Sequence, residues 1–421
     1  MSWFSSKPDA AAAVNNFWPV TSSQTGFGEL TSDDTAWLNT SDAGFQTETQ
    51  TWYTVLADGS LVISQIIWSY LGVFLIPATT QITFKHYNPA TKKTIWKSVN
   101  ASKPKFDRQN CKGDEFEIKH TGTPATDETY SITAHLEKDV QISVQYTKPS
   151  SAPGFKLGSG PEGGVSAFGK DKLKRDGYVV HRFHPLVKSS GTLILSGAIV
   201  DMAGEGMFVH AIQGMRPNLV ASTWNFAFFT TALGQEDEKL GAVRAIQMEF
   251  ETTEDYGPKG PKSGQTKVNI GCVYSSKTDP VPFLVTGQTH TPAGVEDYPA
   301  PSSDVSTASH LNAVVDGETG YPVPGGLEFN WAGDSRDGTG RASARAVIEK
   351  TGNVVGEGGL IEKVDVLHEI PYVIRKGLAA ATGTKPFIYQ YHNATTLEVT
   401  RGEETVPVEG WIFSEASFVN V

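Results

Sequence analysis

The chain has no apolar run long enough to cross a membrane as a helix, and only two cysteines among its 421 residues. A spanning helix needs about 20 consecutive apolar residues, and the longest candidate, residues 66–78, is interrupted by Ser69 and Pro77. Cys111 and Cys272 stand far apart, whereas a disulfide framework needs several closely spaced cysteines. We therefore expect two free thiols in a reducing compartment, no spanning segment and no signal peptide.

The chain also lacks a block of basic residues. Its net charge is −11, with 35 lysines and arginines against 46 aspartates and glutamates. A protein that binds duplex nucleic acid needs a basic face to neutralise phosphates. The densest basic stretch, residues 170–175 (KDKLKR), contains an aspartate and is interpreted as a solvated loop. We expect no nucleic-acid partner, and any contact with a membrane should be apolar.

No sequence pattern of a common enzyme is present: there is no GxSxG, no HExxH and no P-loop. Residues 158–163 match GxGxxG but contain a proline and lack the strand-to-helix context that a phosphate site needs. His181 and His184 would lie on opposite faces of a strand, so they should not share a metal. We predict no catalytic residue, no metal and no cofactor.

Short apolar segments separated by turn residues dominate the chain after about residue 45. Residues 51–55 and 61–70 flank Asp58 and Gly59, a strong hairpin signal. Strands and helices do not alternate, which argues against a parallel sheet. The length suits two domains of about 100–200 residues each. The pattern predicts an all-β protein built from antiparallel sandwiches or barrels.

Residues 1–18 (MSWFSSKPDAAAAVNNFW) differ from the rest. Placed on a helix, their large apolar side chains share one face, and we assign these to membrane binding: Trp3, Phe4, Val14, Phe17 and Trp18. Aromatic residues at both ends of a small-residue stripe suit the headgroup boundary of a bilayer. A helix packed on the domain or closing a barrel end is an equally good interpretation of the residues alone. Residues 19–44 are expected to be a linker.

Several expected strands are apolar on faces that a single sheet would leave open. In residues 223–230, Trp224, Phe226 and Phe228 share one face. One face of such a strand packs on the core of its own domain, and the other face is covered by the second domain or by an apolar ligand. An amide side chain within such an apolar wall needs a hydrogen-bond partner. The candidate ligand-binding residues are Gln65, Trp68, Gln213, Trp224, Asn225, Phe226, Phe228, Tyr389 and Tyr391. Plain core packing is the alternative for each of them.

Four segments resemble motifs of the fungal survival factor family: residues 207–217 (MFVHAIQGMRP), 224–229 (WNFAFF), 360–371 (LIEKVDVLHEIP) and 384–391 (TKPFIYQY). The resemblance implies two tandem lipocalin-like β-barrels, which we place at residues 45–213 and 214–421. It also implies an N-terminal amphipathic helix that binds membranes peripherally, a property that residues 1–18 match in character.

The resemblance further implies a function. Members bind ceramide, move it from endoplasmic reticulum to Golgi without vesicles, and support survival under oxidative stress. We therefore expect a non-enzyme in the cytoplasm, peripherally on Golgi and endoplasmic reticulum membranes, with the nucleus as a further compartment. The alternative is a tandem-lipocalin cyclase or hydratase acting on an apolar polyene, since fold does not fix function. A stress-response scaffold without a ligand is a third interpretation.

Overall fold

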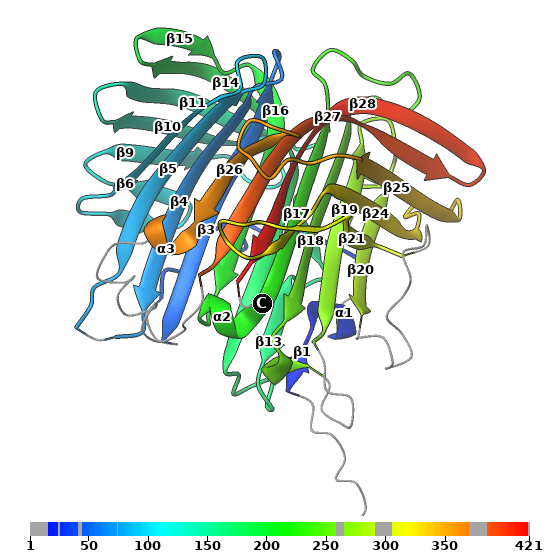
Figure 1. The fold of residues 1–421 in the computed structure, drawn as a ribbon, viewed down its shortest axis with the longest axis horizontal. Coiled ribbons are helices and arrows are strands. Elements are labelled where there is room, and N and C mark those ends of the chain that lie inside the picture. Colours follow the sequence, from blue (N-terminus) through cyan, green and yellow to red (C-terminus); the bar gives the residue numbers. More distant parts are fainter. Residues whose placement is uncertain are drawn as a thin grey trace, which may run out of the picture.

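Two curled antiparallel sheets form almost the whole protein (Figure 1). The computed structural model describes residues 16–23, 26–40, 44–73, 75–257, 265–290, 305–369 and 385–419. Its helices are single turns: α1 (Val20–Ser23), α2 (Pro217–Val220), η1 (Glu254–Tyr256) and α3 (Val366–Glu369). None of the helices formed by these residues is long and apolar enough to span a bilayer. The predicted all-β class is confirmed.

The first sheet takes its strands from the first half of the chain. Its main path runs β6 (Lys93–Asn100), β5 (Thr79–Asn88), β4 (Leu61–Leu71), β3 (Phe45–Leu56), β16 (Gly204–Gln213), β14 (Gly177–Leu195), β11 (Val140–Lys148), β10 (Glu128–Leu136), β9 (Phe116–Thr121), β8 (Asn110–Lys112) and β7 (Lys105–Asp107). Five short strands join it: β1 (Phe17–Trp18), β2 (Phe27–Glu29), β12 (Phe155–Leu157), β13 (Val165–Phe168) and β15 (Ala198–Asp201). A bulge between His184 and Val187 divides β14, which pairs with β13 before the bulge and with β11 after it.

The second sheet takes its strands from the second half. Its path runs β20 (Leu284–His290), β19 (Lys267–Ser275), β18 (Val243–Thr252), β17 (Ala221–Thr231), β28 (Glu404–Phe418), β27 (Phe387–Arg401), β25 (Arg341–Ile348), β24 (Gly326–Asp334) and β21 (Thr307–Leu311), with β26 (Leu360–Asp365) beside β27. Strands β22 (Val314–Val315) and β23 (Pro322–Val323) form a separate hairpin. The chain passes from one sheet to the other between Gln213 and Ala221. We propose the domain boundary at this changeover, after residue 213.

The predicted hairpin at Asp58 and Gly59 joins β3 to β4. Gly59 has a φ of 81°, which a residue with a Cβ rarely adopts. A Cβ at this position would also collide with the Trp411 ring of the second sheet. The turn thus needs glycine both for its conformation and for contact between the sheets.

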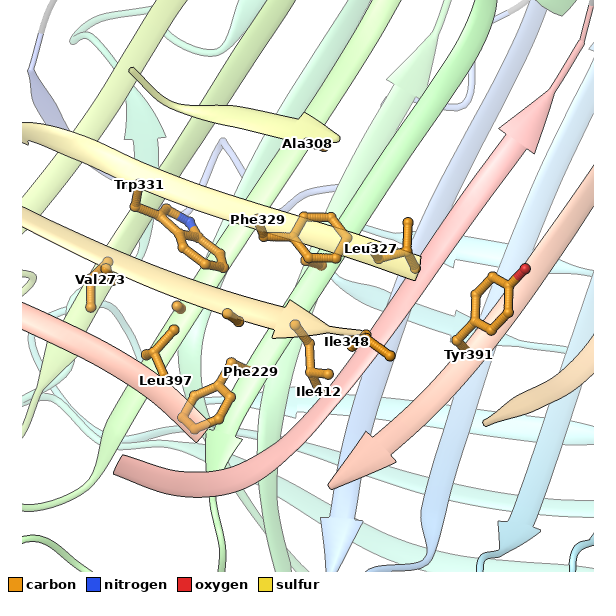
Figure 2. Close-up of a cluster of buried hydrophobic side chains, with 14 of the residues drawn as sticks. Phe229, Val273, Ala308, Leu327, Phe329, Trp331, Ile348, Tyr391, Leu397 and Ile412 are labelled. Carbon is orange, nitrogen blue, oxygen red and sulfur yellow. The ribbon is translucent and has the colours of Figure 1, made fainter. Parts of the chain in front are cut away.

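Each curled sheet encloses its own apolar interior, and the two sheets pack together through their outer faces. Figure 2 shows the interior of the second sheet, where Phe329 and Trp331 of β24 meet Phe229 and Leu397. Alternate residues of β17 point the other way, so Phe226 and Phe228 join a cluster shared with the first sheet. Burial on both faces explains why such strands are apolar throughout.

The end of the predicted N-terminal helix is a strand instead. Phe17 is only 4% exposed, and its ring packs 4.8 Å from Phe168 and 6.3 Å from Phe250. Half-buried Trp18 donates from its indole Nε1 to the Gly169 carbonyl over 3.0 Å. Phe17 therefore belongs to the core, so its assignment to membrane binding is wrong, and Trp18 is held against β13. Trp3, Phe4 and Val14 lie outside the described residues.

The expected linker at residues 19–44 is also largely built into the fold. It supplies α1 and β2, and buried Leu30 lies beside Gly154. The Asp34 carboxylate accepts from Lys156 Nζ over 2.8 Å and pairs with Arg182 at 3.2 Å. The polar composition of residues 19–44 is typical of a linker. The sequence does not show that a charged residue among them, such as Asp34, has buried partners elsewhere in the chain.

We predict that Phe17→Ala lowers the free energy of unfolding by about 3 kcal/mol, because it empties a closed aromatic slot. Urea denaturation of the full chain measures this loss, with Trp18→Ala, next to it but half-buried, as the control. A smaller loss for Phe17→Ala than for Trp18→Ala would contradict a core role for Phe17.

Candidate apolar ligand site between the two sheets

A cavity of about 340 Å³ opens between the outer faces of the two sheets. On one side are β3, β14 and β16 of the first sheet, and on the other are β17, β18, β27 and β28 of the second. The lining residues are Thr47, Thr49, Val179, His181, Ala211, Ile212, Gln213, Pro217, Asn218, Trp224, Phe226, Met248, Val366, Pro386, Phe387, Ile388, Glu415, Ser417, Phe418 and Val419. Most of the wall is apolar, as is usual for small-molecule sites.

The cavity follows from the size of successive outer-face residues. Along β3 these residues change from Tyr53, which contacts Phe226 and Phe413 at 5.4 and 5.3 Å, to Thr51 and then Thr49. Strand β16 makes the same change from valine at 209 to alanine at 211, which pairs with Thr49. Large side chains fill the space between the sheets at one end, and small ones leave it open at the other.

His181 of β14 supplies an imidazole to the cavity wall. The side chain is 5% exposed and lies against Phe183 and Trp224, with ring centroids 6.3 and 5.8 Å away. Among the residues that the structure describes, none forms a hydrogen bond with the ring nitrogens of His181. Burial lowers the pKa of His181 to about 4, so the ring is neutral near pH 7. A neutral imidazole offers one donor and one acceptor to a ligand.

His184, three residues further along the strand, faces the interior of the first sheet and stacks on Phe208 at 5.3 Å. The two rings thus lie on opposite faces, as their spacing predicts. The described residues contain no cluster of histidine, cysteine, aspartate or glutamate that could hold a metal.

Glu415 of β28 supplies a carboxyl group to the opposite wall. It accepts a hydrogen bond from Gln390 Nε2 over 2.7 Å, and Gln390 Oε1 in turn accepts from Lys85 Nζ of the first sheet. Burial raises the pKa of Glu415, although the bond from Gln390 and the charge of Lys85 oppose the rise. A mostly apolar cavity therefore contains, on facing walls, an imidazole and a carboxyl group that can bind the polar end of a ligand.

Three of the nine candidate residues meet in this cavity: Gln213, Trp224 and Phe226. Phe228, two residues along β17 from Phe226, is fully buried in the contact between the sheets. Gln65 of β4 lies outside the cavity lining and donates to Thr51 Oγ1 over 2.8 Å. Of these five residues, only the first three line the cavity.

The other four candidates face the interiors of the sheets and do not line this cavity. Trp68 belongs to the core of the first sheet. In the second sheet, Asn225 Oδ1 accepts from His310 Nε2 over 2.7 Å, and Tyr389 donates to Asp316 Oδ2 over 2.7 Å. Tyr391 is buried in the same interior. In a strand apolar on both faces, the sequence cannot show which face meets the ligand.

Sequence reasoning missed His181 and Glu415 as site residues. In the sequence, His181 stands out only through its spacing from His184, which does not suit a shared metal. Glu415 stands between serine and alanine, just after the apolar residues 411–413 of β28, and a carboxyl so close to an apolar run was the available signal. Its meaning depends on the packing of β28 against the first sheet, which the sequence does not reveal.

Comparisons with known proteins agree with this architecture. The chain is 29% identical to the ceramide-binding protein svf-1 of Neurospora crassa, over 94% of this chain and 91% of the relative. It is 28% identical to the ceramide-binding protein svf1 of Schizosaccharomyces pombe, over 96% and 93% of the two chains. Among solved structures, an AttH-type protein of Nitrosomonas europaea superposes with a TM-score of 0.51 at 13% identity, over 96% of this chain and 99% of the other.

The structural likeness concerns the fold alone, and it confirms the lipocalin-like architecture that the family resemblance implied. The model of the Svf1 family matches residues 2–420, nearly the full length. On this evidence the chain belongs to the Svf1 family.

Proposed function

We propose that this protein binds ceramide in the cavity between its two sheets and carries it between membranes. The observation that supports this best is a mostly apolar cavity with a neutral imidazole on one wall and a half-buried carboxyl group on the other. The relatives' shared name, ceramide-binding protein, gives the ligand class.

The chemistry of ceramide suits such a site. Each methylene removed from water contributes about 0.8 kcal/mol, so the lipid chains favour the apolar wall. The amide and hydroxyl groups of the head need hydrogen bonds but no countercharge, and His181 and Glu415 supply both donors and acceptors. A net charge of −11 is no obstacle to a neutral lipid.

The volume of the cavity sets a condition for binding a whole ceramide molecule. About 340 Å³ is at the small end of the usual ligand pockets, roughly 300–1,000 Å³. A complete two-chain lipid therefore requires the sheets to separate further at the open end, where threonine and alanine give them few contacts.

We further propose non-vesicular transfer from endoplasmic reticulum to Golgi, with support of survival under oxidative stress as its consequence. The protein would be cytoplasmic, peripherally bound to both membranes through its N-terminal segment, with the nucleus as a further compartment. A single short amphipathic segment binds a bilayer reversibly, which a carrier must do.

An enzyme is the second candidate, because a carboxyl group and an imidazole in one apolar cavity could also serve as acid and base. A cyclase or hydratase would convert its polyene substrate, whereas a carrier returns its lipid unchanged. Lipid extracted from the purified protein and analysed by mass spectrometry distinguishes the two. Intact ceramide at about one per chain supports the carrier, and a polyene-derived product supports the enzyme.

We predict that Ala211→Trp abolishes most ceramide binding, because the indole fills the cavity where β16 faces β28. Native mass spectrometry of the full chain gives the bound fraction. Ala198→Trp, the same substitution at an exposed position of β15, is the matched control and should bind like the wild type. Equal ceramide binding by Ala211→Trp and the wild type would show that ceramide does not bind in this cavity.

The low pKa of His181 gives a second prediction. The unfolded chain takes up a proton near pH 6.5 and the native ring only near pH 4, so stability is lost as the pH falls through this window. His181→Phe keeps a ring in the slot but removes this titration. The loss of unfolding free energy between pH 7.5 and pH 5 should be about 2 kcal/mol smaller in His181→Phe. An identical loss in both proteins would mean that His181 is not buried as a neutral ring.

Removal of residues 1–15 should shift the protein from membranes to the soluble fraction without reducing its ceramide binding or its thermal stability. The deletion must stop before Phe17, since that side chain belongs to the core. Membrane fractionation in a fungal host measures the shift. An unchanged membrane fraction would exclude residues 1–15 as the main anchor.

A further inference from the structure

The open end of the cavity lies at one pole of the molecule, where several strands of the first sheet end. Thr47 at the start of β3 pairs with Gln213 at the end of β16, and Gln213 pairs with Val179 near the start of β14. Thr47 also pairs with Ser69 near the end of β4. This pole is at the lower edge of Figure 1, beside α2, β13 and β1.

Two loops at this pole each contain a strongly exposed leucine. Leu75, in the β4–β5 connection, is 86% exposed, and Leu173, in the β13–β14 connection, is 94% exposed. They are the two most exposed large apolar side chains in the described part of the chain. A single exposed leucine is ordinary. Two on loops at the pole where an apolar cavity opens indicate a surface with an apolar partner.

The charge around Leu173 indicates the nature of that partner. Its loop, residues 169–176, contains four basic residues and two aspartates, a net positive charge in a protein whose net charge is −11. Arg175 lies over the Tyr178 ring at 4.1 Å, and Lys172 pairs with Glu162 at 3.8 Å. Lys170 and Lys174 remain exposed on either side of Leu173. Exposed lysines next to an apolar tip match the headgroup region of a bilayer that contains anionic lipids.

The chain enters the described structure at the same pole. The Asn16 carbonyl accepts a hydrogen bond from the Gly169 N–H over 2.8 Å, and Phe17 pairs with Phe168. Asn16, the first residue that the structure describes, therefore lies beside the loop that contains Leu173.

We propose that this pole is a bilayer-docking surface in which the tips at Leu75 and Leu173 enter the headgroup region, Lys170 and Lys174 contact anionic lipid, and the cavity faces the membrane. The inference rests on the proposed carrier function and adds an orientation to it. A lipid can then pass between bilayer and cavity without crossing water. The loop at residues 170–175, interpreted from sequence as merely solvated, becomes part of this surface.

Site-specific fluorescence tests the orientation in the full chain. The native thiols should not compete for label, because Cys111 and Cys272 are buried and burial raises the pKa of Cys111 to about 12. Leu75→Cys, Leu173→Cys and Ile199→Cys are each labelled with a polarity-sensitive dye. Ile199 is the matched control: it is 76% exposed but lies on β15 at the opposite pole.

The labelled proteins are mixed with vesicles of phosphatidylcholine containing about one third phosphatidylserine. We expect a blue shift at positions 75 and 173 and none at 199. The Leu75→Ser/Leu173→Ser double variant should bind these vesicles roughly tenfold more weakly, and Lys170→Glu/Lys174→Glu should weaken binding by a similar factor. Ile199→Ser should bind like the wild type.

Dyes at 75 and 173 that stay in water while the protein sediments with vesicles would overturn the proposal, as would wild-type vesicle binding by the double leucine variant. Ceramide binding of the same variants, measured without vesicles, separates this outcome from failure of the carrier function. Loss of docking with normal ceramide binding supports the proposal. Normal docking by a protein that never holds ceramide would contradict only the carrier function.

Discussion

The two curled sheets, each a half-barrel, depend on each other because each has an apolar outer face that the other covers. Phe226 and Phe228 of β17 and Phe413 of β28 pack against Tyr53 and neighbouring residues of the first sheet. Exposing such a surface costs about 25 cal/mol for each Å² of apolar area, so neither sheet is expected to remain folded alone. The ligand cavity is the part of this contact where smaller side chains leave space.

Polar bonds between the sheets fix how they face each other. Lys85 of β5 is 3% exposed and pairs with Glu362 and Gln390 of the second sheet. His392 donates from Nε2 to the Gly59 carbonyl over 2.8 Å. A buried charge must be paired or it is strongly destabilising, so these bonds favour one arrangement. Because Gln390 also binds Glu415, the same network extends from the sheet contact to the cavity wall.

The sequence predicted the features that depend on local rules. Asp58 and Gly59 marked a hairpin through turn chemistry, and Trp224, Phe226 and Phe228 share a face through strand alternation. It did not show which of two apolar faces meets the other sheet, and the candidates Tyr389 and Asn225 line an interior and not the contact between the sheets. Phe17 was misplaced for a related reason: an aromatic residue suits both a membrane and the slot between Phe168 and Phe250. Glu415 and His181 come together only through packing of distant strands.

The central claim is that the ligand lies between the sheets and not inside one of them. A photoactivatable ceramide, cross-linked to the full-length protein and mapped by peptide mass spectrometry, tests this directly. The account predicts cross-links at outer-face positions of facing strands: Ala211 and Gln213 of β16, Trp224 and Phe226 of β17, and Glu415 and Ser417 of β28. Cross-links confined to the interior of one half-barrel, such as Tyr130 and Tyr146 or Phe329 and Leu397, would contradict it.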